Sequence, residues 1–442
     1  MRMDVSRDNV TGISMYHAVL SSGMDAYFMP LDPSVMVSMF HVFTRFGSID
    51  AKFRDEKGKV IEVKDGTAHF LEHCAFYDPD GSMATDWFNE RGVYSNAWTS
   101  FDHTTYHFQS TGSNTRRNLE YLLKFVTTPY LTDAIVKKEQ GAIGQEIAMY
   151  DDRPGWALMQ NLRLALFCEH PIRRSLGGDK ESIMQITKEY LQRAYDTFYR
   201  PSNLTLVAFM PSAKGERDAK KLFMMAESIS SKLGFSQRKA PEYLYVAEQV
   251  EVKERKIIAQ HHVPEPLVAL GFKARTGMEG STEERLRSDI VNDLLAETIL
   301  SDSSKAVFDI IQAGDARSLS GGHNSGRGFG YFAISGSAKN AERFEEVVVS
   351  MIREQARGKL SREIFENRKR AMISSIARDL ELEDPEDLES RTIHMRAAGF
   401  EIAQLIPVLQ GIRFEDTLEA GRKYLDTDNY AVSVLLPKAE PN

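Results

Sequence analysis

The sequence predicts an α+β protein with two similar domains, each a mostly antiparallel sheet with helices packed on one face. Three observations lead to this fold class. The chain has 442 residues, 42% of them apolar and 27% charged, which is a globular composition with room for more than one domain. Strand-like runs are followed by long helix-like runs, without the strict alternation of parallel-sheet folds. The two halves also share a faint repeat, which predicts similar folds.

The repeat is a helix-like stretch that leads into a β-rich run from an asparagine to a proline. In the first half, 188–199 precedes the run 203–211. In the second half, 418–425 precedes the run 429–437, which starts 226 residues after the first copy. We expect each copy to be a helix followed by a strand.

Both halves also begin with strand-like runs, at 26–47 and 249–273. Between the halves, a helix-like stretch at 212–232 is followed by the polar, turn-rich segment 234–241, which is typical of a linker. The predicted organisation is a first domain at 1–235, a linker at 236–245 and a second, homologous domain at 246–442.

Charge and apolar patterning exclude several classes of function. The 55 basic and 63 acidic residues give a net charge of −8, so a surface for nucleic acids or anionic membranes is not predicted. No window approaches the run of about 20 apolar residues that spans a bilayer, and the first residues lack the pattern of a secretory signal. Two cysteines, Cys74 and Cys168, are too few for a disulfide framework. We therefore expect a cytoplasmic protein with no membrane or nucleic-acid partner.

One segment carries residue types that suit catalysis. Between a turn at 65–66 and Pro79 lies the pentad His69-Phe-Leu-Glu-His73, in a stretch that suits a helix of three turns. On a helix, His69 and His73 stand one turn apart on the same face, so their imidazoles can converge on one metal ion, with Glu72 beside them. The pentad could also be a chance string on a solvated helix face.

This arrangement suits hydrolysis of an unreactive bond at neutral pH. Zinc with three protein ligands keeps an open position where the pKa of water falls to about 7, and a nearby carboxylate can accept the released proton. Glu72 is the candidate for that base. Two histidines do not complete such a site, so a third ligand is expected from elsewhere in the chain.

A second helix-like segment offers the third ligand. Glu139 and Glu146 are seven residues apart and therefore share one helix face, two turns from each other. One could ligate the metal while the other orients a histidine, or both could be ordinary solvated residues. Gly141 and Gly144 each cost this helix about 1 kcal/mol relative to alanine, so we expect another backbone segment to pack closely against them.

The pentad, the segment 96–100 (NAWTS) and the Glu139…Glu146 pair, in this order, resemble the inverzincin peptidases of the pitrilysin/insulinase family. The resemblance covers the whole first half, including 47–50 and 198–203. In length, the chain is similar to the subunits of the family's small bacterial branch, which is related to mitochondrial processing peptidase. Each subunit of that branch has two similar α+β domains.

The resemblance implies a role for each residue of the site. His69, His73 and Glu146 would bind Zn²⁺, and Glu72 would be the general base. Glu139 would take part in catalysis without binding the metal, by supporting the residues that do.

The resemblance also suggests a role for the β-rich run 94–108. In the family this region includes an edge strand that pairs with an extended peptide through its backbone, with Asn96 and Ala97 beside the scissile bond. Without the resemblance, the run is simply an amphipathic strand in the sheet. His103 and His107 are also four residues apart, but on a strand that separation is about 13 Å, too far for one metal ion.

The second half departs from the family pattern. Active relatives place an arginine and a tyrosine after a Ser-Ser helix start, and these side chains bind substrate and stabilise the oxyanion. This chain has Ile311 or Gln312 at the arginine position and Ser318 at the tyrosine position.

Three nearby residues, Arg317, Arg327 and Tyr331, could substitute only if the loop is remodelled. The glycine-rich segment 321–328 lacks the context of a phosphate-binding loop, and we expect a flexible loop there.

These features predict a zinc endopeptidase subunit that hydrolyses short or unfolded peptides. An intact metal site with an incomplete oxyanion partner resembles one subunit of the family's bacterial heterodimers, in which a related chain supplies the arginine and tyrosine. Two alternatives stay open, a self-sufficient homodimeric zinc peptidase and a non-catalytic scaffold subunit. The groups at 69, 72, 73 and 146 argue against a scaffold, which has no physical need for them.

Overall fold

The computed structural model describes residues 2–55, 58–112, 114–275, 277–381 and 385–438. Contacts divide the chain into two compact units. Unit 1 comprises Met1–Ile147, Ser175–Leu244 and Arg378–Gln404, and unit 2 comprises Ala148–Arg174, Tyr245–Ala377 and Leu405–Asn442. Compared with the predicted division of the sequence, 148–174 packs in unit 2 and 378–404 packs in unit 1.

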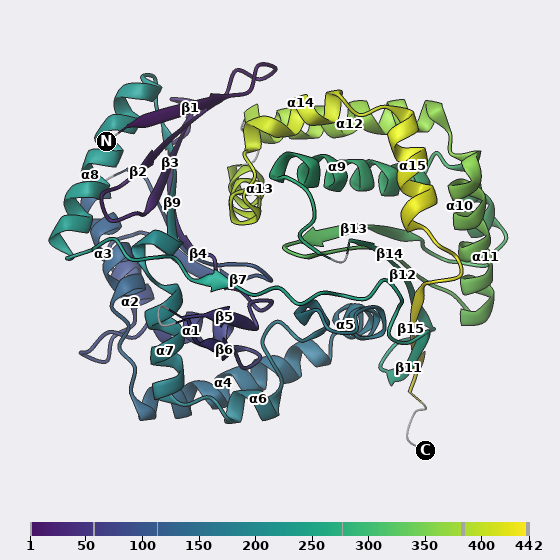
Figure 1. Cartoon of the computed structure of the whole chain (residues 1–442), viewed down its shortest axis with the longest axis horizontal. Helices are drawn as coiled ribbons and strands as arrows, with labels where there is room; N and C mark the ends of the chain where they lie inside the picture. Colours follow the sequence, from purple (N-terminus) through teal and green to yellow (C-terminus); the bar gives the residue numbers. More distant parts are fainter. Residues whose placement is uncertain (1, 56–57, 113, 276, 382–384, 439–442) are drawn as a thin grey trace. The chain divides into compact units, whose positions relative to one another are not determined.

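Unit 1 is built on a seven-stranded sheet with the order β1-β2-β3-β9-β4-β8-β7 (Figure 1). Its neighbouring strands are antiparallel except β3 and β9, which are parallel. A three-stranded sheet with the order β10-β5-β6 completes the β-structure of this unit, and β10 lies within the predicted linker. The strands are β1 (Met3–Arg7), β2 (Ser14–Val19), β3 (Asp25–Leu31), β4 (Ser38–Thr44), β5 (Lys52–Arg54), β6 (Val60–Glu62), β7 (Tyr94–Thr99), β8 (Thr104–Ser110), β9 (Leu204–Pro211) and β10 (Glu242–Tyr243).

One face of this sheet is covered by helices that share its apolar core. Phe40 on β4 and Phe108 on β8 are buried in the same cluster as Phe70 and Leu71 of α1. This burial fixes one side of α1 against the sheet. The helices of the unit are α1 (Thr67–Ala75), α2 (Ala84–Asn89), α3 (Thr115–Thr127), α4 (Asp133–Asp151, whose last turn lies in unit 2), α6 (Lys180–Met184), α7 (Lys188–Phe198), α8 (Gly215–Lys232) and α13 (Pro385–Ala398), with short 3₁₀ turns η2 (Pro201–Asn203) and η4 (Ile402–Gln404).

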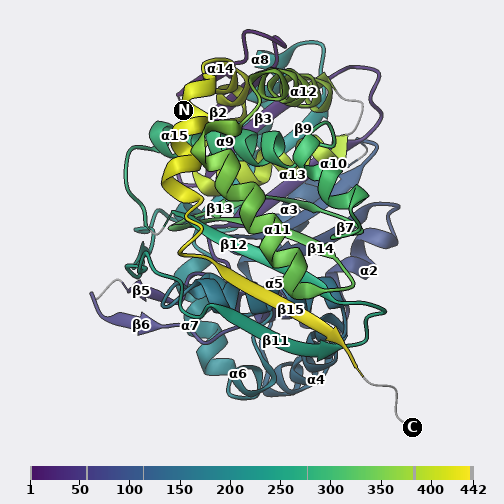
Figure 2. The same ribbon diagram turned by 90° about the vertical axis from the view of Figure 1, so that its right-hand side faces the viewer.

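Unit 2 contains a five-stranded sheet with the order β11-β15-β12-β14-β13. Figure 2 shows α11 running across the front of this sheet, in agreement with its contacts to β12. The strands are β11 (Lys256–His261), β12 (Leu267–Arg275), β13 (Ser320–Gly326), β14 (Phe329–Ser337) and β15 (Ala431–Pro437). The helices are α5 (Pro154–Leu166), α9 (Thr282–Ile299), α10 (Lys305–Gln312), α11 (Ala341–Glu354), α12 (Arg362–Glu381, whose end lies in unit 1), α14 (Leu405–Gln410) and α15 (Phe414–Tyr424), with a 3₁₀ turn η1 (Pro171–Arg173) and a π-helical turn η3 (Gln355–Lys359). None of the helices in the described parts of the chain is long and apolar enough to cross a bilayer.

The two sheets repeat the same topology. The order β3-β9-β4-β8-β7 in unit 1 corresponds to β11-β15-β12-β14-β13 in unit 2, and in both sets only the first pair is parallel. The two copies of the sequence repeat are the helix-strand pairs α7–β9 and α15–β15. The predicted repeat and the α+β fold class are confirmed.

Each unit also takes one helix from the opposite half of the sequence. Helix α5, from the first half, contacts β11, β12 and β15 in unit 2. Helix α13, from the second half, contacts the unit 1 sheet, where Arg396 donates a hydrogen bond to the hydroxyl of Tyr27.

The segment 321–328 is not the flexible loop that its glycines led us to expect. Most of it forms β13, which pairs with β14 over seven residues of each strand. A Cβ at Gly321 would lie 2.1 Å from the carbonyl oxygen of Ala333, so the missing side chain permits the close approach of the two strands. The prediction of a loop was wrong because these glycines serve strand pairing.

The expected close packing against Gly141 and Gly144 is also wrong. Both glycines lie inside α4, and a Cβ at either position would have no atom within 4 Å outside the helix's own nearby backbone. Their cost to the helix is therefore not offset by contact with a neighbouring segment.

This geometry leads to a stability prediction. We expect Gly141→Ala to raise the free energy of unfolding by about 1 kcal/mol, because alanine restricts the unfolded chain and clashes with nothing. Urea titration of both proteins measures the difference. As a matched control, Gly66→Ala should destabilise, since Gly66 has φ 82° and its Cβ would lie 2.4 Å from the carbonyl oxygen of Gly177. A loss of stability in Gly141→Ala would contradict the prediction.

Candidate active site

The predicted pentad lies on α1, which begins after the left-handed Gly66 and has nine residues. Phe70 and Leu71 are buried in the apolar core, so the other side of the helix presents the two histidines together. The rings of His69 and His73 lie 4.7 Å apart between centroids and 79° from coplanar. The helix and the shared face are confirmed.

Helix α4 brings the two glutamates to these histidines. The Oε2 atom of Glu146 lies 3.5 Å from Nε2 of His69 and 3.3 Å from Nε2 of His73. Glu139 lies on the other side of His73, with its Oε2 atom 2.9 Å from Nδ1. The two glutamates therefore contact different nitrogens of one imidazole ring.

The three residues predicted as ligands fit a zinc ion. Two ligand atoms that are each about 2.1 Å from an ion at a tetrahedral angle lie about 3.4 Å apart, which matches the 3.5 and 3.3 Å measured here. Searched over the described residues, the chain has two groups of three His, Cys, Asp or Glu side chains whose ligand atoms all lie within 4.8 Å, and His69, His73 and Glu146 form one of them.

Hydrogen bonding orients His73. Glu139 is buried, and it also accepts a hydrogen bond from the hydroxyl of Tyr77. With Nδ1 of His73 donating to Glu139, Nε2 faces Glu146 and is the nitrogen that presents a lone pair once its proton is lost. This arrangement selects the tautomer that a metal ion requires.

The glutamates and His73 shift each other's pKa. Burial alone would lower the pKa of His73, but contacts with Glu139 and Glu146 outweigh it and raise that pKa to about 9. Contacts from His69 and His73 hold the pKa of Glu146 well below its usual range. At neutral pH and without metal, His73 is therefore protonated and Glu146 is ionised.

Glu72, the residue predicted to be the base, is hydrogen-bonded to a strand of the sheet. Its Oε2 atom accepts a hydrogen bond of 2.6 Å from the hydroxyl of Thr99 on β7. Burial raises the pKa of the Glu72 carboxyl, an effect that His69, Thr99 and His73 oppose. With Oε2 occupied by Thr99, Oε1 is the atom left to accept a proton.

Strand β7 forms one edge of the seven-stranded sheet, and among the described strands only β8 pairs with it. The expected edge strand is therefore present. Ala97 is buried and shares a strand face with Thr99, whereas Asn96 is exposed and lies on the other face. The side-chain oxygen of Asn96 accepts a hydrogen bond of 2.9 Å from the backbone N–H of Ala97.

Comparison with known proteins shows the family of the chain. The profile described as "Insulinase (Peptidase family M16)" matches residues 57–180, and that described as "Peptidase M16 inactive domain" matches residues 185–372. A protein of Bacillus subtilis (strain 168), described as an uncharacterized zinc protease, YmfH, is 31% identical over 429 residues, which cover 96% of this chain and 97% of that protein. The chain belongs to the insulinase family of peptidases. Zinc, the predicted cofactor, is the metal of this family.

Two further relatives are similar to the chain, one in structure and one in sequence. The crystal structure of an M16-like peptidase from Alicyclobacillus acidocaldarius has a TM-score of 0.87 and 28% identity, and each chain covers 99% of the other. A mitochondrial-processing peptidase subunit beta of Arabidopsis thaliana is 27% identical over 163 residues, which cover 36% of this chain and 30% of that protein.

The second-half residues considered as substitutes for the family's arginine and tyrosine are engaged within unit 2. Tyr331 is 2% exposed on β14, so it is not on a loop that could be remodelled. Arg317 forms an ion pair with Glu265, Nε to Oε2, at 2.5 Å. Arg327 is buried and donates a hydrogen bond to the hydroxyl of Tyr245.

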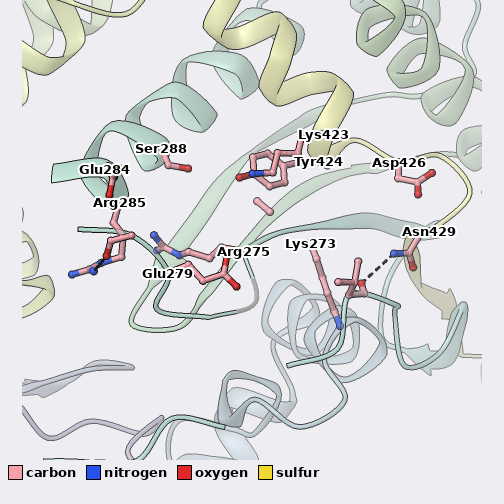
Figure 3. A pocket seen from close by; sticks show the side chains of 13 residues that line it. Lys273, Arg275, Glu279, Glu284, Arg285, Ser288, Lys423, Tyr424, Asp426 and Asn429 are labelled. Carbon is pink, nitrogen blue, oxygen red and sulfur yellow. Dashed lines mark hydrogen bonds between the residues drawn. The ribbon is translucent and has the colours of Figure 1, made fainter. Parts of the chain in front are cut away.

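Unit 2 also contains a cavity of about 440 Å³, between β12, the start of α9 and the end of α15 (Figure 3). Basic and acidic side chains line it, among them Lys273, Arg275, Glu279 and Asp426. Its lining residues include no histidine or cysteine, the two residue types that supply most zinc ligands.

Three contributors to the site escaped the sequence analysis. Tyr77 is four residues after His73, so its helical spacing was a signal that could have been used. Thr99 lies in the segment 96–100 that carries the family resemblance, but neither its position nor that of Gly177 has a spacing that predicts its contact. A Cβ at Gly177 would lie 3.3 Å from Nδ1 of His69, so this glycine lets the backbone approach the histidine.

Proposed function

We propose that the chain is a zinc-dependent endopeptidase that hydrolyses peptide bonds in short or unfolded peptides. The observation that carries the proposal is the convergence of His69, His73 and Glu146, with Glu72 beside them on the same helix. In this proposal the first three residues hold the zinc ion. Bound there, zinc supplies Lewis-acid activation of water and of the scissile carbonyl.

Glu72 handles the proton in the proposed reaction. It accepts the proton of the attacking water on Oε1 and delivers it to the nitrogen of the leaving amine, so that peptide and water give an acid and an amine. Thr99 keeps the carboxylate in position by binding Oε2. Glu139 and Tyr77 hold His73 in the required tautomer.

The substrate binds as an additional strand in this proposal. The outer edge of β7 passes beside the strand position from which Thr99 reaches Glu72, and the backbone N–H of Ala97 donates to Oδ1 of Asn96, a bond that an incoming peptide strand would replace. An extended peptide can use this edge, whereas a folded protein cannot present its backbone there. Peptide length and folding, more than side-chain identity, would therefore select substrates.

We further propose that the active form is a heterodimer with a related chain. By the resemblance, Ile311 or Gln312 and Ser318 stand where active relatives have an arginine and a tyrosine, and Tyr331 is buried. The mitochondrial-processing peptidase relative is itself described as a subunit. The expected partner lacks the pentad and carries the missing arginine and tyrosine.

Metal removal tests the catalytic proposal. Dialysis against a zinc chelator should abolish hydrolysis of an unfolded peptide by the chain with its partner, and about one equivalent of Zn²⁺ at this site should restore it. Glu146→Ala should bind no zinc here and regain no activity, because a ligand is missing. Full activity after removal of all zinc, checked by elemental analysis, would refute the proposal.

Zinc uptake by the metal-free protein should depend on pH. The ion requires neutral His73, whose pKa is raised to about 9, so the apparent affinity should rise with pH up to about 9 and then level off. Glu146 is already ionised over this pH range, so it does not contribute to the dependence of zinc affinity on pH. Competition against a chelator of known affinity measures this dependence. Glu139→Gln removes a group that raises the pKa of His73, so the pH at which zinc affinity levels off should fall. If that pH did not change, His73 would not be the group that controls zinc affinity.

A further inference from the structure

The opposite face of the unit 1 sheet carries a second buried group of ligand-type side chains. His41 on β4 and His107 on β8 are direct cross-strand partners. Their neighbours Phe40 and Phe108 point into the core under α1, so by strand alternation the two histidines point the other way. Glu389 of α13, which packs in the same unit, completes the group.

The three side chains converge. Nε2 of His41 lies 2.8 Å, and Nδ1 of His107 3.6 Å, from the same Oε1 atom of Glu389. All three ligand atoms lie within 4.8 Å of one another, as they do in the candidate active site. The side chains come from three elements, and 282 residues separate His107 from Glu389.

This group is buried and its polar atoms are not satisfied. His41, His107 and Glu389 are 0%, 6% and 5% exposed. Within the described residues, neither ring nitrogen of His41, nor Nδ1 of His107, nor Oε2 of Glu389 has a hydrogen-bond partner. The approach of His41 to Glu389 therefore lacks the geometry of a hydrogen bond. Buried carboxylates are normally paired, hydrogen-bonded or bound to a metal, so these atoms call for a ligand.

We propose that His41, His107 and Glu389 bind a structural zinc ion, distinct from the candidate catalytic one. Two imidazoles and a carboxylate favour zinc over magnesium or calcium, which prefer oxygen ligands. The free Oε2 atom of Glu389 supplies a fourth donor, and the burial leaves no open position for substrate.

The ion would have a mechanical role. It ties α13, which comes from the second half of the sequence, to a sheet formed by the first half. Metal bound only by the folded state adds to stability, so occupancy of this site would hold α13 against β4 and β8. The proposal does not depend on peptidase activity.

The test counts zinc in the full chain after removal of the first site. The wild type should hold about two zinc equivalents, and the double variant His69→Ala/His73→Ala about one, after gel filtration at micromolar free zinc. Adding His107→Ala should remove the remaining zinc. Thr105→Ala is the matched control, because Thr105 is buried two residues earlier on β8 and offers no imidazole; it should retain the zinc.

Spectroscopy keeps the test independent of whether His107→Ala folds. The His69→Ala/His73→Ala variant loaded with Co²⁺ should show the ligand-field absorption of a four-coordinate site, and its thermal midpoint should rise on metal addition. Absence of stoichiometric zinc and of this absorption in the double variant would overturn the proposal. Zinc that is retained equally after His107→Ala would also overturn it.

Discussion

Replacing Glu72 with glutamine is expected to lower the rate of peptide hydrolysis by about 100–10,000-fold while leaving zinc bound. Glutamine keeps the shape of the side chain and can still contact Thr99, but it cannot accept the proton that hydrolysis releases. The expected loss therefore falls on turnover rather than on metal affinity. Peptide turnover and zinc content, measured on the same preparation, give the two readings.

Two controls make this result specific. Glu90→Gln changes an exposed glutamate of the same unit and should leave turnover unchanged. Glu146→Ala should lose both turnover and the zinc of this site, which separates a ligand from a base. If Glu72→Gln cleaved peptides at the wild-type rate, the role proposed for Glu72 would be wrong.

The second large effect concerns the partner. The tetrahedral intermediate carries a negative charge on oxygen, and loss of one well-placed donor costs about 100–1000-fold in rate. On the family resemblance, Ile311 or Gln312 and Ser318 stand at the arginine and tyrosine positions, so the chain alone should be nearly inactive on unfolded peptides. Addition of the related chain should raise turnover by at least about 100-fold.

The measurement compares turnover with and without the partner, alongside the mass in solution. A partner in which the arginine and tyrosine are replaced should still associate but should not activate. High turnover by the chain alone, abolished by Arg317→Ala, would instead support a self-sufficient homodimer. Zinc content should stay the same in every arm, because the proposed ligands of both zinc ions belong to this chain, on α1 and α4 for one ion and on β4, β8 and α13 for the other.

Features that follow a local period were predictable from the sequence. The one-turn spacing of His69 and His73 determines that they share a face of α1, and the seven-residue spacing of Glu139 and Glu146 does the same on α4. The repeated helix-strand pairs predicted two sheets of like topology, because similar patterns of burial form similar layers. Each of these predictions depends only on the spacing of residues that are close together in the sequence.

Features that depend on contacts between distant segments were decided by the tertiary structure. The contact of Thr99 with Glu72 requires β7 to pack beside α1. Gly141 is open because no distant segment packs against that part of α4. In the sequence, the histidine nearest to His107 is His103, four residues away and directly before β8. The partners of His107 are His41 on the adjacent strand and Glu389 on a helix from the other half of the sequence. Helical and strand periods fix which face a side chain occupies, but only packing over long chain separations fixes which side chains meet.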